Sequence, residues 1–194
     1  MDLPKATYID SILEVAKPEL PYKEWHRLIA TPFRYSLPCP QSRQARFRPA
    51  YFDRNILYCS LKSTTVLYEH AYHFLKERIH LTGSRDYGQR TAFTLFINAK
   101  AVTDIHGQPD IKAIMDRRNY SASHEFIKTK SDVKILSYPS CRDPEHGPNY
   151  AALDITALGK DIGDERTLAF YFDQSDQSVF WTDLGLKIYW KDVC

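Results

Sequence analysis

Glycine is scarce in this chain: it accounts for seven of the 194 residues. The sequence contains neither G-x-G-x-x-G nor G-x-x-x-x-G-K-[ST], the motifs that hold nucleotide phosphates on backbone amides. H-E-x-x-H and G-x-S-x-G are absent as well. The usual signs of a Rossmann fold, a P-loop ATPase, a zincin protease and an α/β-hydrolase are therefore missing. Any bound phosphate must be held by side chains, and arginine is the best suited because its fork bonds two oxygens at once.

The length of the chain suits one domain that can bury a core without metal or disulfides. Its four cysteines are far apart and show no zinc-ligand spacing, which is typical of reduced thiols in a cytosolic protein. No run of 18 apolar residues exists, and the first residues lack the basic and apolar regions of a signal peptide. We expect a cytoplasmic protein with no membrane span and no metal site.

Apolar spacing predicts strands and helices that alternate along the chain. Helices are expected at 6–18, 22–30, about 63–79, 110–115 and 121–130. Strands are expected at 56–60, 91–99, 133–138, 149–154, 167–173, 178–184 and 186–190. This order favours an α+β fold, a single domain with mixed or antiparallel sheets and flanking helices. Residues 1–32 are expected to form an N-terminal helical lead-in, and residues 33–194 the main domain.

Basic residues gather near the start of the chain. Between Tyr22 and Arg54 there are seven Lys and Arg against two acidic residues, whereas from Ala151 onward there are four against eight. The basic stretch from Tyr22 to Arg54 is suited to binding an anion. Arginines alternate there with aromatic residues, which fits a phosphate clamp with a stacked base, single-stranded nucleic acid, or an ordinary exposed loop.

Three further stretches carry candidate chemistry. Glu69 lies among apolar and aromatic residues of a predicted helix, so its carboxylate needs a partner or a purpose. His70 and His73 follow it, but no third metal ligand is indicated. Ser121 either caps a helix or belongs to a site. The segment from Ser137 to Asn149 reads as a strand that runs into a polar loop, a common place for site residues.

Taken together, these stretches resemble the RES-domain family, which is named for an Arg, a Glu and a Ser. The motifs that carry the resemblance are Arg34-Tyr35, Arg46-Phe47-Arg48-Pro49, Leu57-Tyr58, Glu69, Tyr120-Ser121-Ala122-Ser123, Pro139-Ser140-Cys141-Arg142-Asp143-Pro144 and Asn149. Two departures stand out: Gln44-Ala45 replaces the glycines that often precede the second arginine, and His124 stands where the family often has Gln.

The resemblance implies a fold similar to ADP-ribosyltransferases, with 33–194 as the RES catalytic domain. It further implies a toxin of a bacterial type II toxin–antitoxin pair that cleaves the nicotinamide–ribose bond of NAD+ and arrests growth. Water or phosphate would be the acceptor, with NAD+ as substrate and no cofactor. The implied partner is an Xre-type helix-turn-helix antitoxin, through which alone the chain would meet nucleic acid.

Site roles follow from the same resemblance. The expected catalytic residues are Glu69, Arg46 and Ser121. The expected NAD+-binding residues are Arg34, Tyr35, Arg48, Tyr58, Ser123, Ser140 and Asn149. Which of Ser121, Ser123 and Ser140 is the functional serine stays open at this point. Two other functions also stay open: a nucleic-acid-directed toxin or binding module, and an inactive interaction module that keeps the fold.

Overall fold

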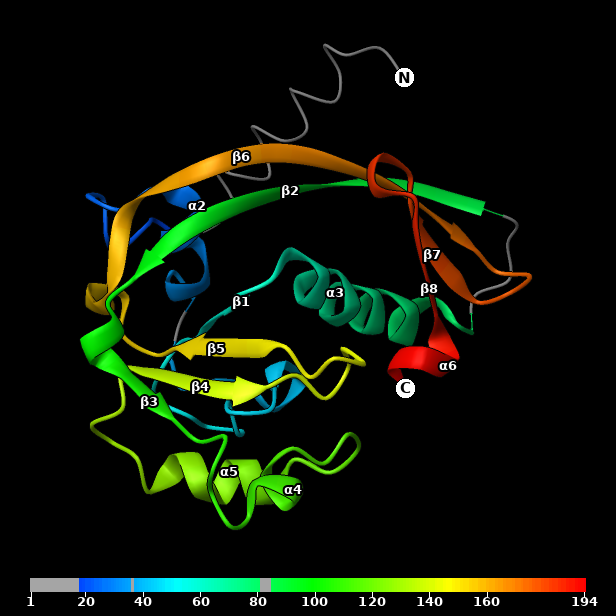
Figure 1. Cartoon of the computed structure of the whole chain (residues 1–194). Helices are drawn as coiled ribbons and strands as arrows, with labels where there is room; N and C mark the ends of the chain where they lie inside the picture. The colour runs from blue at the N-terminus through cyan, green and yellow to red at the C-terminus, as the bar shows by residue number, and fades with distance from the viewer. Residues whose placement is uncertain (1–17, 36, 81–84) are drawn as a thin grey trace.

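The computed structural model describes residues 18–35, 37–80 and 85–194, whose strands form two four-stranded sheets (Figure 1). The strands are β1 (Leu57–Ser60), β2 (Arg85–Ile97), β3 (Val102–Asp104), β4 (Ile135–Pro139), β5 (Pro148–Ala152), β6 (Leu158–Asp173), β7 (Ser178–Trp181) and β8 (Leu186–Tyr189). The α-helices are α2 (Arg27–Ala30), α3 (Ser63–Arg78), α4 (Ile111–Ile114), α5 (Ser121–Lys128) and α6 (Trp190–Val193). Short 3₁₀ helices cover Thr31–Phe33, Gln41–Arg43, Ala99–Ala101, Ile155–Ala157 and Thr182–Leu184. The expected α+β class is confirmed.

The first sheet has the strand order β1-β5-β4-β3 and is mixed. β5 runs antiparallel to β1 and β4, while β3 runs parallel to β4. Because β5 pairs Asn149 with Ser60 on one side and with Tyr138 on the other, these three side chains share one face of the sheet. Tyr58 lies on the same face, two residues before Ser60.

The second sheet has the order β2-β6-β7-β8 and is antiparallel throughout. β2 and β6 form a long curved ribbon over α3 (Figure 1), with register shifts at two points. The sequence predicted only the apolar second half of each strand. The missed segments, 85–90 and 158–166, are mostly polar and exposed, and each becomes a strand by pairing with the apolar half of the neighbouring strand: 85–90 pair with 168–173, and 158–166 pair with 92–97.

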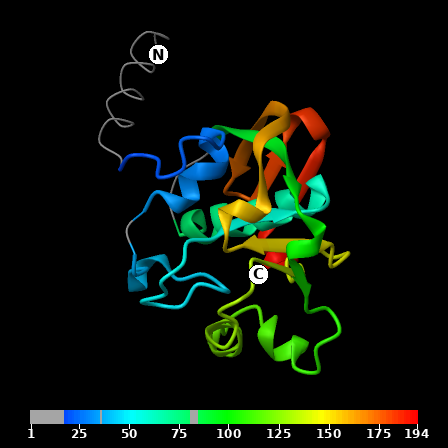
Figure 2. The same cartoon turned by 90° about the vertical axis from the view of Figure 1, so that its left-hand side faces the viewer.

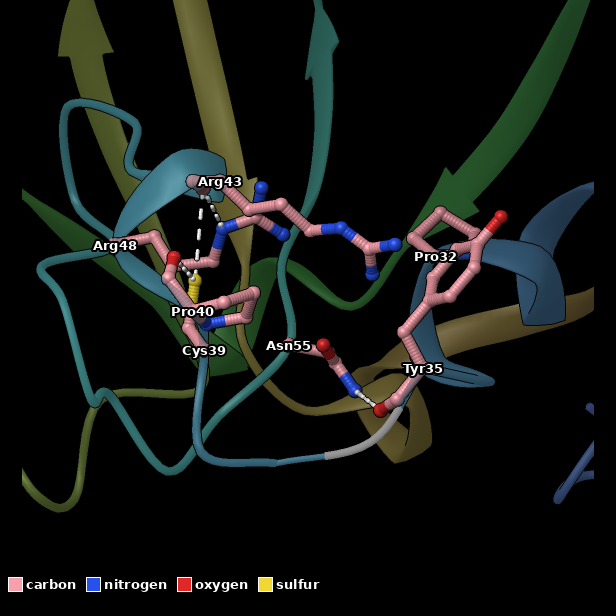
Figure 3. A pocket seen from close by; sticks show the side chains of 7 residues that line it. All are labelled: Pro32, Tyr35, Cys39, Pro40, Arg43, Arg48 and Asn55. Carbon is pink, nitrogen blue, oxygen red and sulfur yellow. Dashed lines mark hydrogen bonds between the residues drawn. The ribbon is translucent and has the colours of Figure 1, made fainter.

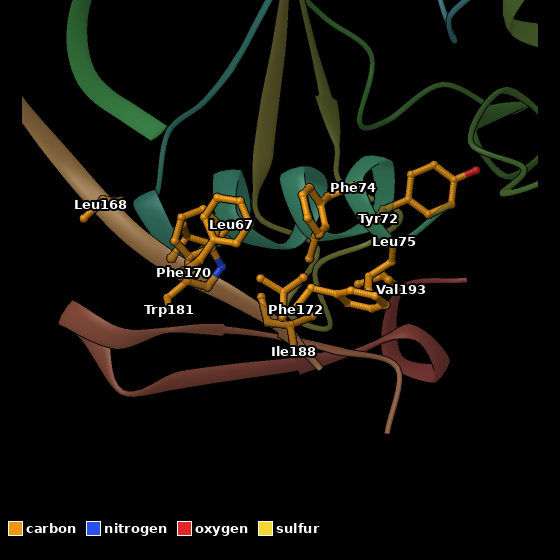
Figure 4. Packing of buried hydrophobic residues seen from close by; sticks show 12 residues of the cluster. Leu67, Tyr72, Phe74, Leu75, Leu168, Phe170, Phe172, Trp181, Ile188 and Val193 are labelled. Carbon is orange, nitrogen blue, oxygen red and sulfur yellow. The ribbon is translucent and has the colours of Figure 1, made fainter. Parts of the chain in front are cut away.

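Helix α3 packs against the second sheet through an apolar face (Figure 4). Leu67, Ala71, Phe74 and Leu75 recur at helical spacing and are buried against strand residues and α6. The members from the sheet and α6 are Leu168, Phe170, Phe172, Val179, Trp181, Ile188 and Val193. This apolar layer has more buried residues than either of the other two core clusters of the described residues, and it fixes the helix that carries Glu69.

Helices α4 and α5 cover the face of the first sheet that carries Tyr138 (Figure 1). Ile114 of α4 and Ile127 of α5 are buried there with Leu136 and Phe47. Both helices were predicted from the sequence, and both are shorter than predicted. Ser121 is the first residue of α5 and does not cap it, since the N-cap position belongs to Tyr120.

The segment before the basic loop lies against the opposite face of the first sheet (Figure 2). Leu20, Tyr22 and Trp25 are packed on a cluster that contains Ile135 and Ala152. Of the two expected N-terminal helices, the one at 6–18 lies outside the described residues except for Pro18. The one at 22–30 is reduced to α2, followed by the 3₁₀ turn Thr31–Phe33.

Candidate functional site

Glu69 is the centre of a polar cluster between α3 and the first sheet. Its Oε1 accepts a hydrogen bond of 2.7 Å from Ser140 Oγ and another of 2.7 Å from Asn149 Nδ2. Its Oε2 has no hydrogen-bond partner or ion pair among the described residues, and the side chain is only partly buried. One oxygen is thus fixed by the sheet while the other remains available to a ligand.

Both groups that hold Glu69 are themselves fixed. Asn149 Oδ1 accepts a hydrogen bond from Ser60 Oγ across the β1–β5 pair. Ser140 Oγ accepts from the backbone N–H groups of Arg142, at 3.1 Å, and Asp143, at 3.0 Å. Because Ser140 accepts two hydrogen bonds and donates one, its hydroxyl proton points to Glu69. The orientation of the carboxylate is set by two strands and one loop.

The loop after β4 is also tied to α3, the helix that carries Glu69. The buried Asp143 carboxylate accepts hydrogen bonds from Thr65 Oγ1, at 2.6 Å, and from the backbone N–H groups of Glu145 and Gly147. Thr65 belongs to the first turn of α3. A Cβ at Gly147 would lie 2.2 Å from Thr65 Oγ1 and 2.8 Å from Asp143 Oδ2, so the loop approaches the helix more closely than other residues allow.

Tyrosine side chains line the same face of the first sheet. Desolvation raises the pKa of Tyr138 well above its ordinary value, and the negative charge of Glu69 raises it further. Desolvation also raises the pKa of Tyr58, although this side chain is 39% exposed, and the charge of Arg48 opposes the shift. Both hydroxyls therefore stay protonated, and the hydroxyl of Tyr138 is close enough to Glu69 for the carboxylate charge to act on it.

Arg46 and Ser123 hold the structure around this cluster together. The Arg46 guanidinium donates to the carbonyl oxygens of Ile114 and Asp116, both at 2.9 Å, and to Cys141 Sγ at 3.0 Å. It also stacks over the ring of Tyr120, 4.8 Å from its centroid. Ser123 is fully buried, and its single hydroxyl proton lies between two acceptors, the carbonyl oxygens of Arg46 and Tyr120. Neither side chain forms a hydrogen bond with Glu69.

A separate pocket of about 270 Å³ lies beside the basic loop (Figure 3). Its lining residues are Pro32, Tyr35, Cys39, Pro40, Arg43, Arg48 and Asn55. The Arg43 guanidinium extends across the pocket and lies 4.6 Å from the centroid of the Tyr35 ring. Asn55 Nδ2 fixes this wall by donating to the carbonyl oxygen of Tyr35 at 3.0 Å. The pocket is therefore lined by two guanidinium groups and one aromatic ring.

The predicted site residues thus fall into three groups. Ser140 and Asn149 both donate hydrogen bonds to Glu69, and Tyr58 lies on the same sheet face as Asn149. Tyr35 and Arg48 line the pocket. The remaining residues, Arg34, Arg46, Ser121 and Ser123, do not line the pocket and do not bond Glu69.

Two of the predicted site residues, Arg34 and Ser121, neither line the pocket nor bond Glu69 and contact other parts of the chain. Arg34 is buried, and its Nε donates to the carbonyl oxygen of Pro18 at 2.7 Å. Ser121 is exposed at the start of α5, where its backbone N–H donates to Asn119 Oδ1. Sequence reasoning missed Arg43 and Tyr138. The only signal for Arg43 was its membership of the basic stretch.

His70 and His73 do not form a metal site with their neighbours. His70 turns to the second sheet, where its Nε2 accepts a hydrogen bond from Arg90 Nε at 3.1 Å and its ring packs on Phe170 and Trp181. Desolvation lowers the pKa of His70 to about 4. Within the described ranges, no three His, Cys, Asp or Glu side chains gather closely enough to hold a metal ion.

This arrangement defines a class of protein: an α+β domain with a half-buried carboxylate held by one sheet and a separate arginine-lined pocket in the basic loop. The RES domain family model matches residues 20–173, most of the chain. The chain therefore belongs to the RES-domain family, which is known from toxin–antitoxin systems. No curated protein matches the chain. In the part of the chain that the structure describes, no helix is both long and apolar enough to cross a membrane.

Proposed function

We propose that this chain is the toxin of a type II toxin–antitoxin pair and that it degrades NAD+ by cleaving the nicotinamide–ribose bond. Membership of the RES-domain family supports the toxin role. The observation that carries the chemistry is the Glu69 carboxylate, which has one oxygen bonded to Ser140 and Asn149 and the other without a partner among the described residues.

The reaction calls for a carboxylate of this kind. When the bond between C1′ of the ribose and the pyridinium nitrogen breaks, its electron pair goes to the nitrogen and nicotinamide departs neutral. Positive charge then develops on the ribose, and Glu69 Oε2 stabilises it. An oxygen of water or phosphate bonds to C1′, and when water is the acceptor its proton passes to the surrounding solvent. A charge already in place before the reaction is worth ~3–4 kcal/mol by precedent from single donor groups.

Ser140 is the serine that we place in this mechanism, as the residue that positions Glu69. Its hydroxyl bonds the carboxylate directly, whereas Ser121 is exposed on α5 and Ser123 is consumed by two backbone carbonyls. Asn149 has the same positioning role from the neighbouring strand. Together they keep Oε1 turned to the sheet, so that Oε2 is turned to the substrate.

The other predicted residues divide between binding and support. Tyr58, which is partly exposed, would pack against the nicotinamide riboside half and exclude water from one side of it. Tyr35 and Arg48 would bind the remainder of the dinucleotide in the pocket. Arg34 and Arg46 act through structure, because their guanidinium groups are bonded to backbone carbonyls.

The biological setting belongs to the same proposal. The chain would act in the cytoplasm, where NAD+ depletion arrests growth, and an Xre-type helix-turn-helix antitoxin would hold it inactive. We propose an ADP-ribosyltransferase-like fold, with which the two sheets on either side of α3 agree. Binding of nucleic acid by the chain itself has less support, since two of the basic-loop arginines are turned inward.

The test is incubation of the purified, antitoxin-free chain with NAD+, with and without millimolar phosphate, followed by chromatography of the products. Free nicotinamide with ADP-ribose identifies a glycohydrolase, and a phosphorylated ADP-ribose that requires phosphate identifies a phosphorylase. Glu69→Gln should lower the rate by about 10²–10³-fold. Glu77→Gln is the matched control, because Glu77 lies on the same helix but is exposed.

Two results would contradict the proposal. NAD+ that stays intact in both reactions would favour a nucleic-acid-directed module or an inactive one. A steep dependence of RNA or DNA binding on salt would then separate these two. Full activity in a folded Glu69→Gln protein would be consistent with NAD+ cleavage but would show that Glu69 is not required for it.

A further inference from the structure

We propose that Arg43 and Tyr35 form a binding site for the ADP half of the substrate, so that the chain acts on the intact dinucleotide and discriminates against nicotinamide mononucleotide. This inference rests on the proposed function for its substrate, but its binding test does not require turnover. Arg43 lies outside the motifs of the family resemblance and was not among the residues predicted for the site.

The placement of Arg43 is the first argument. It ends the 3₁₀ turn Gln41–Arg43, and its guanidinium lies 4.6 Å from the centroid of the Tyr35 ring. Its backbone carbonyl accepts hydrogen bonds from Arg48 Nε and Cys39 Sγ, which fix the turn while the side chain reaches across the pocket (Figure 3). A guanidinium stacked on an aromatic ring keeps its edge donors free for an anion.

The charge of the pocket is the second argument. Neither Arg43 nor Arg48 has a carboxylate within 4 Å among the described residues, and no acidic side chain lines the pocket. Two guanidinium groups five residues apart therefore face an open space without a countercharge. A diphosphate supplies that countercharge, and each guanidinium can bond two of its oxygens.

The size of the pocket fits a part of the dinucleotide. Whole small-molecule sites usually enclose about 300–1,000 Å³, and this one holds about 270 Å³. That volume suits one nucleotide-sized portion, with the rest of the substrate extending beyond it. The Pro32 and Pro40 rings offer apolar surfaces for the adenine.

Arg48 connects the pocket with the carboxylate. It lines the pocket, and its positive charge acts on the hydroxyl of Tyr58. Tyr58 shares its sheet face with Asn149, which holds Glu69. A dinucleotide with its ADP half in the pocket would therefore direct its nicotinamide half along Tyr58 toward Glu69.

The binding test is calorimetric titration of the full chain with ADP alone, compared between wild type, Arg43→Ala, Arg43→Lys and Arg166→Ala. Arg166 is the matched control, since it is an exposed arginine on β6 of the other sheet. Arg43→Ala should weaken ADP binding about 10- to 100-fold, the range for losing one or two hydrogen bonds to a charged group. The affinity of Arg43→Lys for ADP should lie between those of wild type and Arg43→Ala, because lysine keeps the positive charge but lacks the planar guanidinium that bonds two oxygens.

The kinetic test compares NAD+ with nicotinamide mononucleotide. Arg43→Ala should raise KM for NAD+ and leave kcat/KM for the mononucleotide unchanged, while wild type prefers NAD+. Equal ADP affinity in wild type and Arg43→Ala, or equal use of both substrates by wild type, would overturn the inference. The chain could also bind ADP in an Arg43-dependent manner and yet fail to cleave NAD+. That result would support the binding site and contradict the proposed reaction.

Discussion

The two sheets of this molecule differ in how their side chains are used. The second sheet meets α3 through aromatic and aliphatic groups such as Phe170, Phe172 and Trp181. The first sheet presents hydroxyl and amide groups to the same helix, and these bond Glu69 and the residues around it. One helix therefore separates an apolar layer from a polar one, with Glu69 on one side and His70 on the other.

The contrast shows how a half-buried carboxylate is kept in place. Polar networks alone specify orientation but contribute little net free energy, because each bond replaces a bond to water. The apolar layer supplies the burial that holds α3 rigid. We therefore expect substitutions in the second sheet to change stability and those in the first sheet to change activity.

The largest expected effect is that of Trp181→Ala. Trp181 is 1% exposed, and its loss should lower the free energy of unfolding by about 3–5 kcal/mol. Its Nε1 has no hydrogen-bond partner among the described residues, so Trp181→Phe should cost much less. Urea unfolding of both variants measures the difference. A folded Trp181→Ala protein with an altered KM for NAD+ would show that the two sheets do not divide the roles in this way.

The next effect is that of Ser140→Ala, which removes one bond to Glu69 and the acceptor of two backbone N–H groups. We expect kcat to fall about 10- to 100-fold, and the free energy of unfolding to fall by about 1–3 kcal/mol. Ser121→Ala is the comparison, and for this exposed residue we expect a stability change within about 0.5 kcal/mol and unchanged turnover. Steady-state kinetics of both variants show which serine contributes to the reaction. A loss of turnover in Ser121→Ala but not in Ser140→Ala would identify Ser121 as the functional serine.

The third expected effect, which is gradual and smallest per pH unit, concerns the dependence of stability on pH. The pKa of His70 is lowered to about 4 by desolvation, with Arg90 and His73 contributing, while in the unfolded chain it is about 6.5. The unfolded chain binds the proton first as pH falls, so stability should decrease between pH 6.5 and 4, by at most about 1.4 kcal/mol per pH unit.

His70→Gln should flatten this pH dependence in urea unfolding followed at pH 7, 6 and 5. The substitution should not abolish the pH dependence, because desolvation lowers the pKa of His73 as well. An unchanged slope in the variant would mean that His70 does not stay neutral against the second sheet.

Much of the fold could be read from the sequence because local patterns decide it. The helical period around Leu67, Ala71 and Leu75 and the apolar run at 91–97 are local signals, and both elements are present. The polar halves of β2 and β6 carry no such signal, since each becomes a strand by pairing with the apolar half of the other strand. The expected boundary at residue 33 stays a prediction, although residues before it pack on the core and the family match begins at 20.

The site was less predictable because its bonds join distant segments. Glu69 stood out as a carboxylate among apolar neighbours, but its partners lie 71 and 80 residues further along the chain. Nothing local distinguishes Arg46, which is bonded to backbone carbonyls, from Arg48, which faces the pocket two residues later. The conformation of the loop decides which arginines face a ligand, and this conformation cannot be inferred from the residue types alone.

The close approach at Gly147 has a consequence for sequence variation. Gly107 has open space around it and is free to change, whereas any larger residue at 147 meets the side chains of Thr65 and Asp143. A substitution at one of these three positions therefore requires compensation at another. Among relatives that keep this loop, we expect positions 65, 143 and 147 to covary, so that a pattern in aligned sequences would report how tightly the loop binds the helix.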